Sequence, residues 1–212
     1  MRPPAFFQCQ DIDMTSAQIQ KEVYGRVGIR VTHTHQLVQA VATALATSPT
    51  DNVEIGLSVA GESFVAPVLV VNNPHLRPIE DVSIDITRNT PLAREQDDKM
   101  MGLLNRFGWL VPTNLLKKAV IRLLMSIPGL QQRGTGTFQV SMTPTVDQST
   151  APMFSTVGIL VGGKVTERPV VVNGKVVPRP IMRVTLSADH RKWDGRAGEQ
   201  FLNRLKQAME AI

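Results

Sequence analysis

The amino-acid sequence predicts an α/β fold in which a mixed β-sheet is flanked by helices. The chain of 212 residues is long enough for one sizeable domain, and residues 1–212 contain no repeat, low-complexity stretch or obvious linker. Alternating segments and amphipathic segments are interspersed along it, as in a domain that mixes strands with helices. Asn173-Gly174 separates two alternating segments, and this dipeptide is typical of a tight β-hairpin turn.

In the N-terminal half we expect strands over residues 5–12, 53–59 and 64–71 and helices over residues 16–26, 35–46 and 76–94. Thr15 or Ser16 is expected to cap the first helix, and Thr34 precedes the second. Pro67 predicts an edge position or a bulge for its strand, and Pro91 is expected to fray the third helix.

Residues 97–133 contain an amphipathic segment, 114–127, which is expected to form a helix. Its apolar side carries Leu116, Val120, Leu123 and Ile127, and its basic residues are Lys117, Lys118 and Arg122. Three interpretations stay open: packing on the core or on a partner subunit, a wall of a hydrophobic acceptor pocket, or contact with a membrane surface.

The last third of the chain is rich in predicted strands and ends in a helix. Strands are expected over residues 136–142, 156–162, 165–172 and 175–186. The helix is expected over 196–211, with an inward face made by Ala197, Phe201, Leu205 and Ala208 or Met209.

Composition narrows the classes of partner. A net charge of +5 favours polyanions, which include nucleic acid, acidic membrane and phosphate-bearing small molecules. The basic residues are scattered and aromatic residues are only 5%, which argues against nucleic-acid binding. No apolar run is long enough to span a membrane, and no signal peptide is evident. The single cysteine, Cys9, excludes an intrachain disulfide and favours the cytoplasm.

Three of the four histidines have an ordinary structural explanation. His33 and His35 alternate as a pair of metal ligands could, but no Cys, His or carboxylate cluster lies near them in sequence. We therefore expect them at a helix N-terminus and predict no metal site. His75 lies in a predicted turn. The glycine-rich run at 134–138 lacks the Gly-Lys-Ser/Thr ending of a phosphate-binding loop.

His190 lies in the run 187-SADHRKWDG-195, between a predicted strand and a predicted helix. Functional residues often lie on loops that rigid elements hold in place, so His190 is a candidate catalytic base. The alternative is a histidine that pairs with Asp194 to cap the helix. The His-x-x-x-Asp spacing alone leaves both interpretations open.

The run MRVTLSADHRKWDGRAGEQFLNRLKQAME resembles the C-terminal end of the dihydrolipoamide acyltransferase catalytic domain of 2-oxoacid dehydrogenase complexes, and its His-x-x-x-Asp-Gly signature also occurs in chloramphenicol acetyltransferase. Upstream, GTFQVS at 136–141 resembles the family strand that ends in a catalytic serine or threonine. The likeness covers most of the chain except about 97–133. It implies a chloramphenicol acetyltransferase-like fold for the single domain, residues 1–212.

The resemblance implies an acyltransferase with three site residues. His190 would be the general base that deprotonates the acceptor, and Ser141 would donate a hydrogen bond to the oxyanion. Asp194 would brace the loop through a salt bridge, and Gly195 would let the loop turn into the helix. No permanently bound cofactor is implied; acetyl-CoA or another acyl-CoA would be a co-substrate, for which the sequence identifies no binding residues. The family architecture also implies a homotrimer, or a multiple of trimers, with active sites between subunits.

Departures from the family pattern occur at 142–144, at 153–156 and over 97–133, and they suggest a stand-alone enzyme. The first hypothesis is an acetyltransferase that uses acetyl-CoA to acylate a hydroxyl of a small molecule, with a tetronate-type intermediate as one example. The second is a dihydrolipoamide acyltransferase core whose lipoyl domain is on another chain. A non-catalytic trimeric scaffold is the alternative from a different class.

Overall fold

Six strands form one mixed β-sheet in the computed structural model, which describes residues 4–48, 50–59, 66–107, 136–153 and 156–212, with the backbone alone for residues 96–107. The strand order is β1-β6-β5-β4-β2-β3. The strands are β1 Ala5–Asp13, β2 Glu54–Ser58, β3 Val68–Asn72, β4 Phe138–Met142, β5 Gly158–Val172 and β6 Lys175–Asp189. β4 is parallel to both β2 and β5, whereas the other neighbours are antiparallel.

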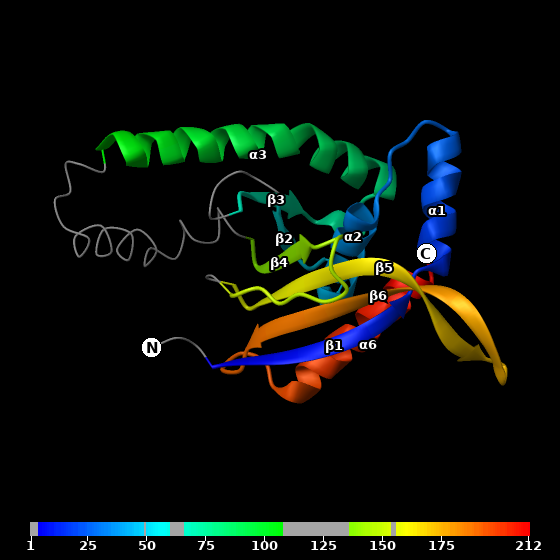
Figure 1. The fold of residues 1–212 in the computed structure, drawn as a ribbon. Coiled ribbons are helices and arrows are strands. Elements are labelled where there is room, and N and C mark those ends of the chain that lie inside the picture. The colour runs from blue at the N-terminus through cyan, green and yellow to red at the C-terminus, as the bar shows by residue number, and fades with distance from the viewer. Residues whose placement is uncertain (1–3, 49, 60–65, 108–135, 154–155) are drawn as a thin grey trace.

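Within the described residues, four long helices accompany the sheet, and Figure 1 shows how they are arranged around it. They are α1 Thr15–Arg26, α2 His33–Leu45, α3 Ile79–Phe107 and α6 Gly195–Glu210, and η1 Pro74–Leu76 is a short 3-10 helix. α2 and α6 pack against each other and against one face of the sheet, while α3 packs along β3 and α2. The predicted α/β class, a mixed sheet flanked by helices, is therefore confirmed.

The two faces of the sheet carry different side chains, because successive residues of a strand point to opposite faces. On β6, Met182, Val184, Leu186 and Ala188 face α2 and α6 and belong to the main hydrophobic core. The intervening residues Thr185, Ser187 and Asp189 are buried on the second face. The loop after β4 lies over that face.

Backbone and side-chain bonds tie this loop to the second face: Lys164 N–H donates to the Val146 carbonyl at 2.8 Å, and Gln148 Nε2 donates to Cys9 Sγ at 3.0 Å. Gly163 allows the approach, because a Cβ there would collide with the Asp147 carbonyl.

The β5–β6 hairpin confirms the predicted turn. Asn173 and Gly174 both have positive φ, 51° and 75°, as a two-residue type I′ turn requires. The two strands predicted over 156–162 and 165–172 are one continuous strand, β5, with a register shift between Gly162 and Val165. A bulge of this kind resembles a break in a sequence pattern although the strand continues through it.

Several predicted boundaries were wrong. α3 continues through Pro91 and runs for 29 residues instead of fraying there. Thr15 and Ser16 do not cap α1; Asp13 instead accepts from the Thr15 backbone N–H at 2.9 Å. Thr32, rather than Thr34, caps α2. Pro67 precedes β3, which is an edge strand as predicted. The expected helix over 114–127 lies outside the described residues.

β1 pairs with β6 along its whole length. This pairing matters for the site because it brings the start of β1 beside His190, which follows the end of β6. The nine residues of β1 pair with β6 from Ala5–Asp189 to Asp13–Ile181. On the second face, Arg183 binds Asp11 through two hydrogen bonds of 2.7 and 2.8 Å, and its guanidinium lowers the pKa of the Asp11 carboxyl. A bidentate pair of this geometry keeps the two strands in register.

His35 is a buried titratable group in the first turn of α2. Only 5% of the residue is exposed, and its Nδ1 has no hydrogen-bond partner among the described residues. Burial lowers the pKa of His35 to about 4, because an imidazolium ion there would lose its hydration. His33 lies beside it with Nδ1 3.0 Å from Gln36 Oε1. Both histidines therefore open α2, as the sequence predicts.

The lowered pKa of His35 predicts a loss of stability in acid. The unfolded chain binds a proton at His35 below its ordinary pKa of about 6.5, whereas the folded chain stays neutral until about pH 4. Stability should therefore fall as the pH drops through this window, by about 3 kcal/mol at most. We expect His35→Gln to flatten this part of the curve of unfolding free energy against pH, measured by urea titration.

The same pH dependence in His35→Gln and in the parent protein would contradict a buried, neutral His35. A His35→Leu variant provides a second measurement should the glutamine amide itself destabilise α2.

Candidate functional site

His190 directly follows the last residue of β6, and four residues separate it from the start of α6, on an exposed loop. Its backbone N–H donates to the Pro4 carbonyl at 2.8 Å, where the chain enters β1. The ring of Phe6 meets the imidazole edge-on, with 5.4 Å between ring centroids. The N-terminal strand therefore contacts both the backbone and the ring of His190.

The loop around His190 is held at every backbone N–H from Asp189 to Trp193. The Asp189 N–H donates to the Val157 carbonyl, and the Lys192 and Trp193 N–H groups donate to the Asp189 carbonyl at 2.9 and 3.0 Å. The Arg191 N–H donates to Asp189 Oδ1 at 3.0 Å. Three of the five bonds therefore end on Asp189, the residue immediately before His190.

Asp189 also forms an ion pair with Arg191 across the histidine. Arg191 Nη2 lies 2.7 Å from Oδ2, and Nε lies 3.0 Å from Oδ1. The Asp189 side chain is 5% exposed, whereas that of Arg191 is 63% exposed. The hydrogen bond from Arg191 lowers the pKa of the Asp189 carboxyl, against the opposing effect of burial. A buried carboxylate requires such partners to stay ionised.

Trp193 anchors the other side of the loop to the core. Its ring stacks on Phe138 at the start of β4, with centroids 6.0 Å apart, and tilts against Phe201 of α6 at 5.3 Å. Such aromatic pairs contribute about 0.5–1.5 kcal/mol each beyond the area that they bury. The loop is thus tied to both the sheet and the last helix.

Asp194 caps α6: its Oδ1 accepts from the Ala197 N–H at 2.7 Å. Among the described residues no arginine pairs with Asp194 and no hydrogen bond joins it to His190, so the expected salt bridge of Asp194 stays a prediction. Gly195 starts the helix without a positive φ and has room for a Cβ, so the expected need for glycine there is wrong.

Gly198 is the glycine that this region needs. A Cβ at that position would collide with Gln8 Oε1 and would lie 2.9 Å from the Phe6 ring. The lack of a side chain at Gly198 allows β1 and α6 to approach each other beside His190.

Ser141 lies near the carboxyl end of β4. Its neighbour Val140 faces the core, so the Ser141 side chain points to the second face, where it is half-buried. Within the described part of the chain its hydroxyl has no hydrogen-bond partner, which leaves it available to a ligand. Met142, the first departure from the family pattern, packs against the core, and Thr143 Oγ1 donates to the Gly162 carbonyl.

His190 and Ser141 do not meet within one chain. Ser141 is level with Val161 of β5 and, through it, with Thr185 of β6. His190 lies five residues beyond Thr185, toward the opposite end of β4. With a rise of about 3.3 Å per residue and about 4.8 Å between strands, their Cα atoms are roughly 19 Å apart. A general base must lie within hydrogen-bond reach of the proton it takes, so one copy cannot use both groups together.

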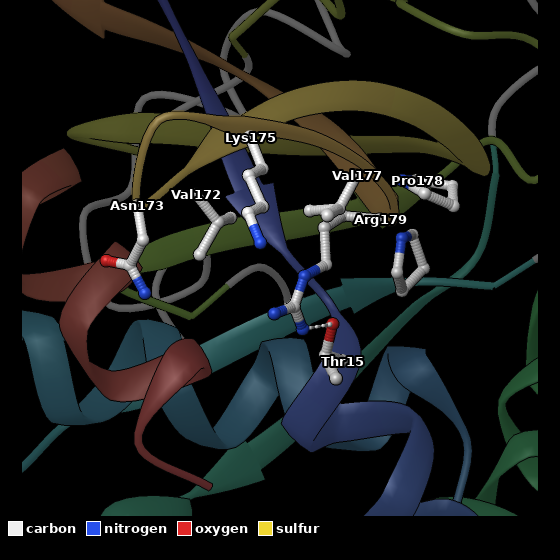
Figure 2. A pocket seen from close by; sticks show the side chains of 8 residues that line it. Thr15, Val172, Asn173, Lys175, Val177, Pro178 and Arg179 are labelled. Carbon is white, nitrogen blue, oxygen red and sulfur yellow. Dashed lines mark hydrogen bonds between the residues drawn. The ribbon is translucent and has the colours of Figure 1, made fainter.

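One concavity lies away from both residues, at the β5–β6 hairpin, with a volume of about 490 Å³. Figure 2 shows Lys175 and Arg179 beside it. The Arg179 guanidinium hydrogen-bonds to Thr15 Oγ1 at 3.2 Å and lies 3.9 Å from the Asp13 carboxylate. Because Asp13 balances this charge and His190 follows the other end of β6, we do not assign the chemistry to this concavity.

A second concavity, of about 350 Å³, lies behind the His190 loop and is lined in part by Trp193, Phe138 and Asp51. Asp51 accepts hydrogen bonds from Thr47 and Ser48, so its carboxylate already has partners. Across the described residues there is no group of three or more possible metal ligands. None of the described helices is long and apolar enough to cross a membrane.

Comparison with known proteins supports the resemblance inferred from the sequence. Residues 128–212 match the model of the 2-oxoacid dehydrogenases acyltransferase (catalytic domain). No curated protein matches the chain. A structure of a probable dihydrolipoamide acetyltransferase from Listeria monocytogenes 4b F2365 is similar with a TM-score of 0.73 and 20% identity, over 99% of this chain and 86% of that one.

Two further structures place the fold more broadly. The dihydrolipoamide acetyltransferase of Azotobacter vinelandii matches with a TM-score of 0.70 and 20% identity, over 98% of this chain and 82% of that one. A chloramphenicol acetyltransferase matches with a TM-score of 0.53 and 12% identity, over 98% and 89%. The predicted resemblance to the 2-oxoacid dehydrogenase acyltransferase domain, and the chloramphenicol acetyltransferase-like fold, are confirmed.

Sequence reasoning missed the residues that hold His190 in place, namely Asp189, Arg191, Phe6 and Gly198. Asp189 and Arg191 flank the histidine directly in the sequence. Two opposite charges on either side of a candidate base were the signal that could have indicated an ion pair there. The contacts of Phe6 and Gly198 depend on β1 reaching the far end of β6, which no local pattern reports.

The cap formed by Asp194 leads to a test of its role. Asp194→Ala should lower the free energy of unfolding by about 1 kcal/mol, because the Ala197 N–H loses its acceptor. Asp194→Asn keeps an acceptor oxygen and should stay within a few tenths of a kcal/mol of the parent protein. Urea unfolding of the three proteins measures both differences. Equal losses in the alanine and asparagine variants would show that charge, not capping, is what Asp194 contributes.

Proposed function

We propose that this protein transfers an acyl group from a CoA thioester to a hydroxyl of a small molecule, with His190 as the general base. The observation that carries the proposal is the His190 loop. An exposed imidazole lies on a loop held at five consecutive backbone N–H groups, in a segment that matches an acyltransferase catalytic domain. Rigid placement of a histidine is what proton removal from an acceptor requires.

The chemistry assigns different tasks to the two ends of the sheet. The acceptor hydroxyl is a poor nucleophile until a base takes its proton as it attacks the thioester carbonyl. The attack places negative charge on the carbonyl oxygen, and the hydroxyl of Ser141 would stabilise this charge by donating a hydrogen bond. When the intermediate collapses, the C–S bond breaks, and CoA leaves as the thiol with the proton that His190 had taken.

The Azotobacter vinelandii structure supports these roles, since it addresses a serine, a histidine and an asparagine in the catalytic mechanism of that enzyme. Its asparagine follows its histidine by four positions, the spacing of His190 and Asp194 here. In this chain the corresponding residue is an aspartate that caps α6. We therefore assign catalysis to His190 and Ser141 and a structural role to Asp194.

The separation of His190 from Ser141 favours an oligomer in which one copy supplies each residue to a shared site. The family resemblance suggests a trimer as the smallest assembly, and one of the similar structures is the cubic core of a pyruvate dehydrogenase multienzyme complex. A closed ring of three copies would create three equivalent interfaces and three such sites. The net charge of +5 suits the phosphates of a CoA donor.

A second candidate has its own support. The matched family model and the first similar structures are 2-oxoacid dehydrogenase acyltransferases and dihydrolipoamide acetyltransferases. The protein could thus act as the core of such a complex, with dihydrolipoamide as the thiol acceptor. Both candidates use the same two residues and differ in the acceptor.

Release of free thiol from acetyl-CoA tests the proposal when the protein is given a panel of alcohols or dihydrolipoamide. We expect turnover with at least one alcohol. His190→Ala should lower kcat by about 10²–10⁴-fold and Ser141→Ala by about 10²–10³-fold, as losses of a base and of one oxyanion donor do. Ser141→Thr, which keeps the hydroxyl, is the matched control and should retain most activity.

Different outcomes separate the alternatives. Turnover with dihydrolipoamide and none with alcohols favours the multienzyme core. Equal thiol release by the parent protein and His190→Ala removes His190 from the mechanism. A stable trimer that binds no thioester favours the non-catalytic scaffold.

A further inference from the structure

Asp189 is the most heavily bonded residue near the proposed base, yet its carboxylate points away from the core. It lies on the second face of the sheet, at the end of β6, and its side chain is 5% exposed. Its Oδ1 accepts both from the Arg191 backbone N–H and from Nε of the same residue, each at 3.0 Å. The backbone N–H and the guanidinium of Arg191 therefore both bind the Asp189 carboxylate. The two residues of this pair lie on either side of His190 in the sequence.

This arrangement depends on both charges. A carboxylate removed from water is stable only while it is paired and hydrogen-bonded, and removing one partner of such a pair leaves an uncompensated buried charge. Within the described residues, Arg191 is the cation that pairs with Asp189. Losing the guanidinium should thus draw Asp189 toward water or toward protonation, and either change loosens the turn that contains His190.

We propose that the Asp189–Arg191 ion pair is a positioning device for His190, which sets the backbone of the loop and so the direction of the imidazole. The pair acts on His190 indirectly, through the loop. The hydrogen bonds that Asp189 accepts from this loop come from the backbone N–H groups of residues 191–193. This proposal rests on the proposed function, in which His190 is the base. It adds Asp189 and Arg191 as residues that carry no proton in the reaction. The acyl transfer nevertheless needs them to reach its full rate.

The Arg191 side chain is largely exposed, so a competing role has to be separated from positioning. A cation at this place could instead bind the phosphates of the thioester donor directly. Contact with the donor predicts a raised KM for acyl-CoA. Positioning predicts a lowered kcat with little change in KM, because the interaction matters most when the proton moves.

The kinetic experiment compares Arg191→Ala, Arg191→Lys and Asp189→Asn with the parent protein, using acetyl-CoA and acetyl-pantetheine as donors. Positioning predicts that Arg191→Ala lowers kcat on the order of 10–100-fold with either donor, as a small misplacement of a catalytic group does. KM should stay within about twofold. Arg191→Lys keeps the charge but not the fork of two N–H groups, and should recover part of the rate.

Arg196→Ala is the matched control for the loss of a positive charge. Arg196 is exposed on the first turn of α6, and no ion pair is found for it among the described residues. We expect this variant to keep the parent rate with both donors. A rise of KM for acetyl-CoA alone in Arg191→Ala, at unchanged kcat, would overturn the proposal in favour of donor binding.

A second readout does not depend on activity. Hydrogen–deuterium exchange, followed by mass spectrometry, reports how often the backbone N–H groups of residues 190–193 open. In Arg191→Ala and Asp189→Asn we expect exchange in this peptide to accelerate roughly fivefold or more, as the loss of a supporting hydrogen bond implies, with the core of α2 unchanged. Unchanged exchange in the loop would overturn the positioning role.

The two readouts keep the two proposals apart. Loss of protection in the variants, with no thiol release by the parent protein on any acceptor, would refute the proposed function but retain the ion pair as the brace of the loop. Turnover in the parent protein, with unchanged exchange and unchanged kcat in the variants, would retain the function and refute the positioning role.

Discussion

The buried Asp189 carboxylate is the constraint on which the geometry of the candidate site depends. Its position at the end of β6 is set by the pairing of β6 with β1 and β5, and its charge is offset by Arg191. Three backbone N–H groups of the following loop end on this one residue. The orientation of His190 thus follows from strand pairing, through a carboxylate that cannot leave its partners without a cost in free energy.

The sheet has a second consequence for function. Because β6 runs antiparallel to β5, and β5 runs parallel to β4, the loop that carries His190 lies at the end of the sheet opposite to Ser141. The strand that carries Ser141 and the loop that carries His190 are both fixed by backbone hydrogen bonds, with the two Cα atoms roughly 19 Å apart. A rigid fold of this kind can unite the two groups only between copies, so catalysis and assembly would depend on the same contacts.

Features with a local cause could be predicted from the sequence. The Asn173-Gly174 turn, the amphipathic α6 and the alternating β1 were all found at nearly their observed places. Features that depend on distant residues could not. Pro91 stays inside α3, and the Thr15 N–H at the start of α1 donates to Asp13 rather than to one of the favoured hydroxyls. No pattern near His190 could reveal that Pro4 and Phe6 lie against it.

The candidate residues themselves, His190 and Ser141, came from a resemblance of motifs, while their separation became evident only from strand order and register.

The central claim is that two copies complete each site, and mixing of two inactive variants tests it most directly. Copies carrying His190→Ala are combined in equal amounts with copies carrying Ser141→Ala, and exchange between them is verified by mass spectrometry. Random assembly should restore about a quarter of the parent activity, because one site in four then receives both intact residues. Mixed oligomers that stay as inactive as either variant alone would contradict the account.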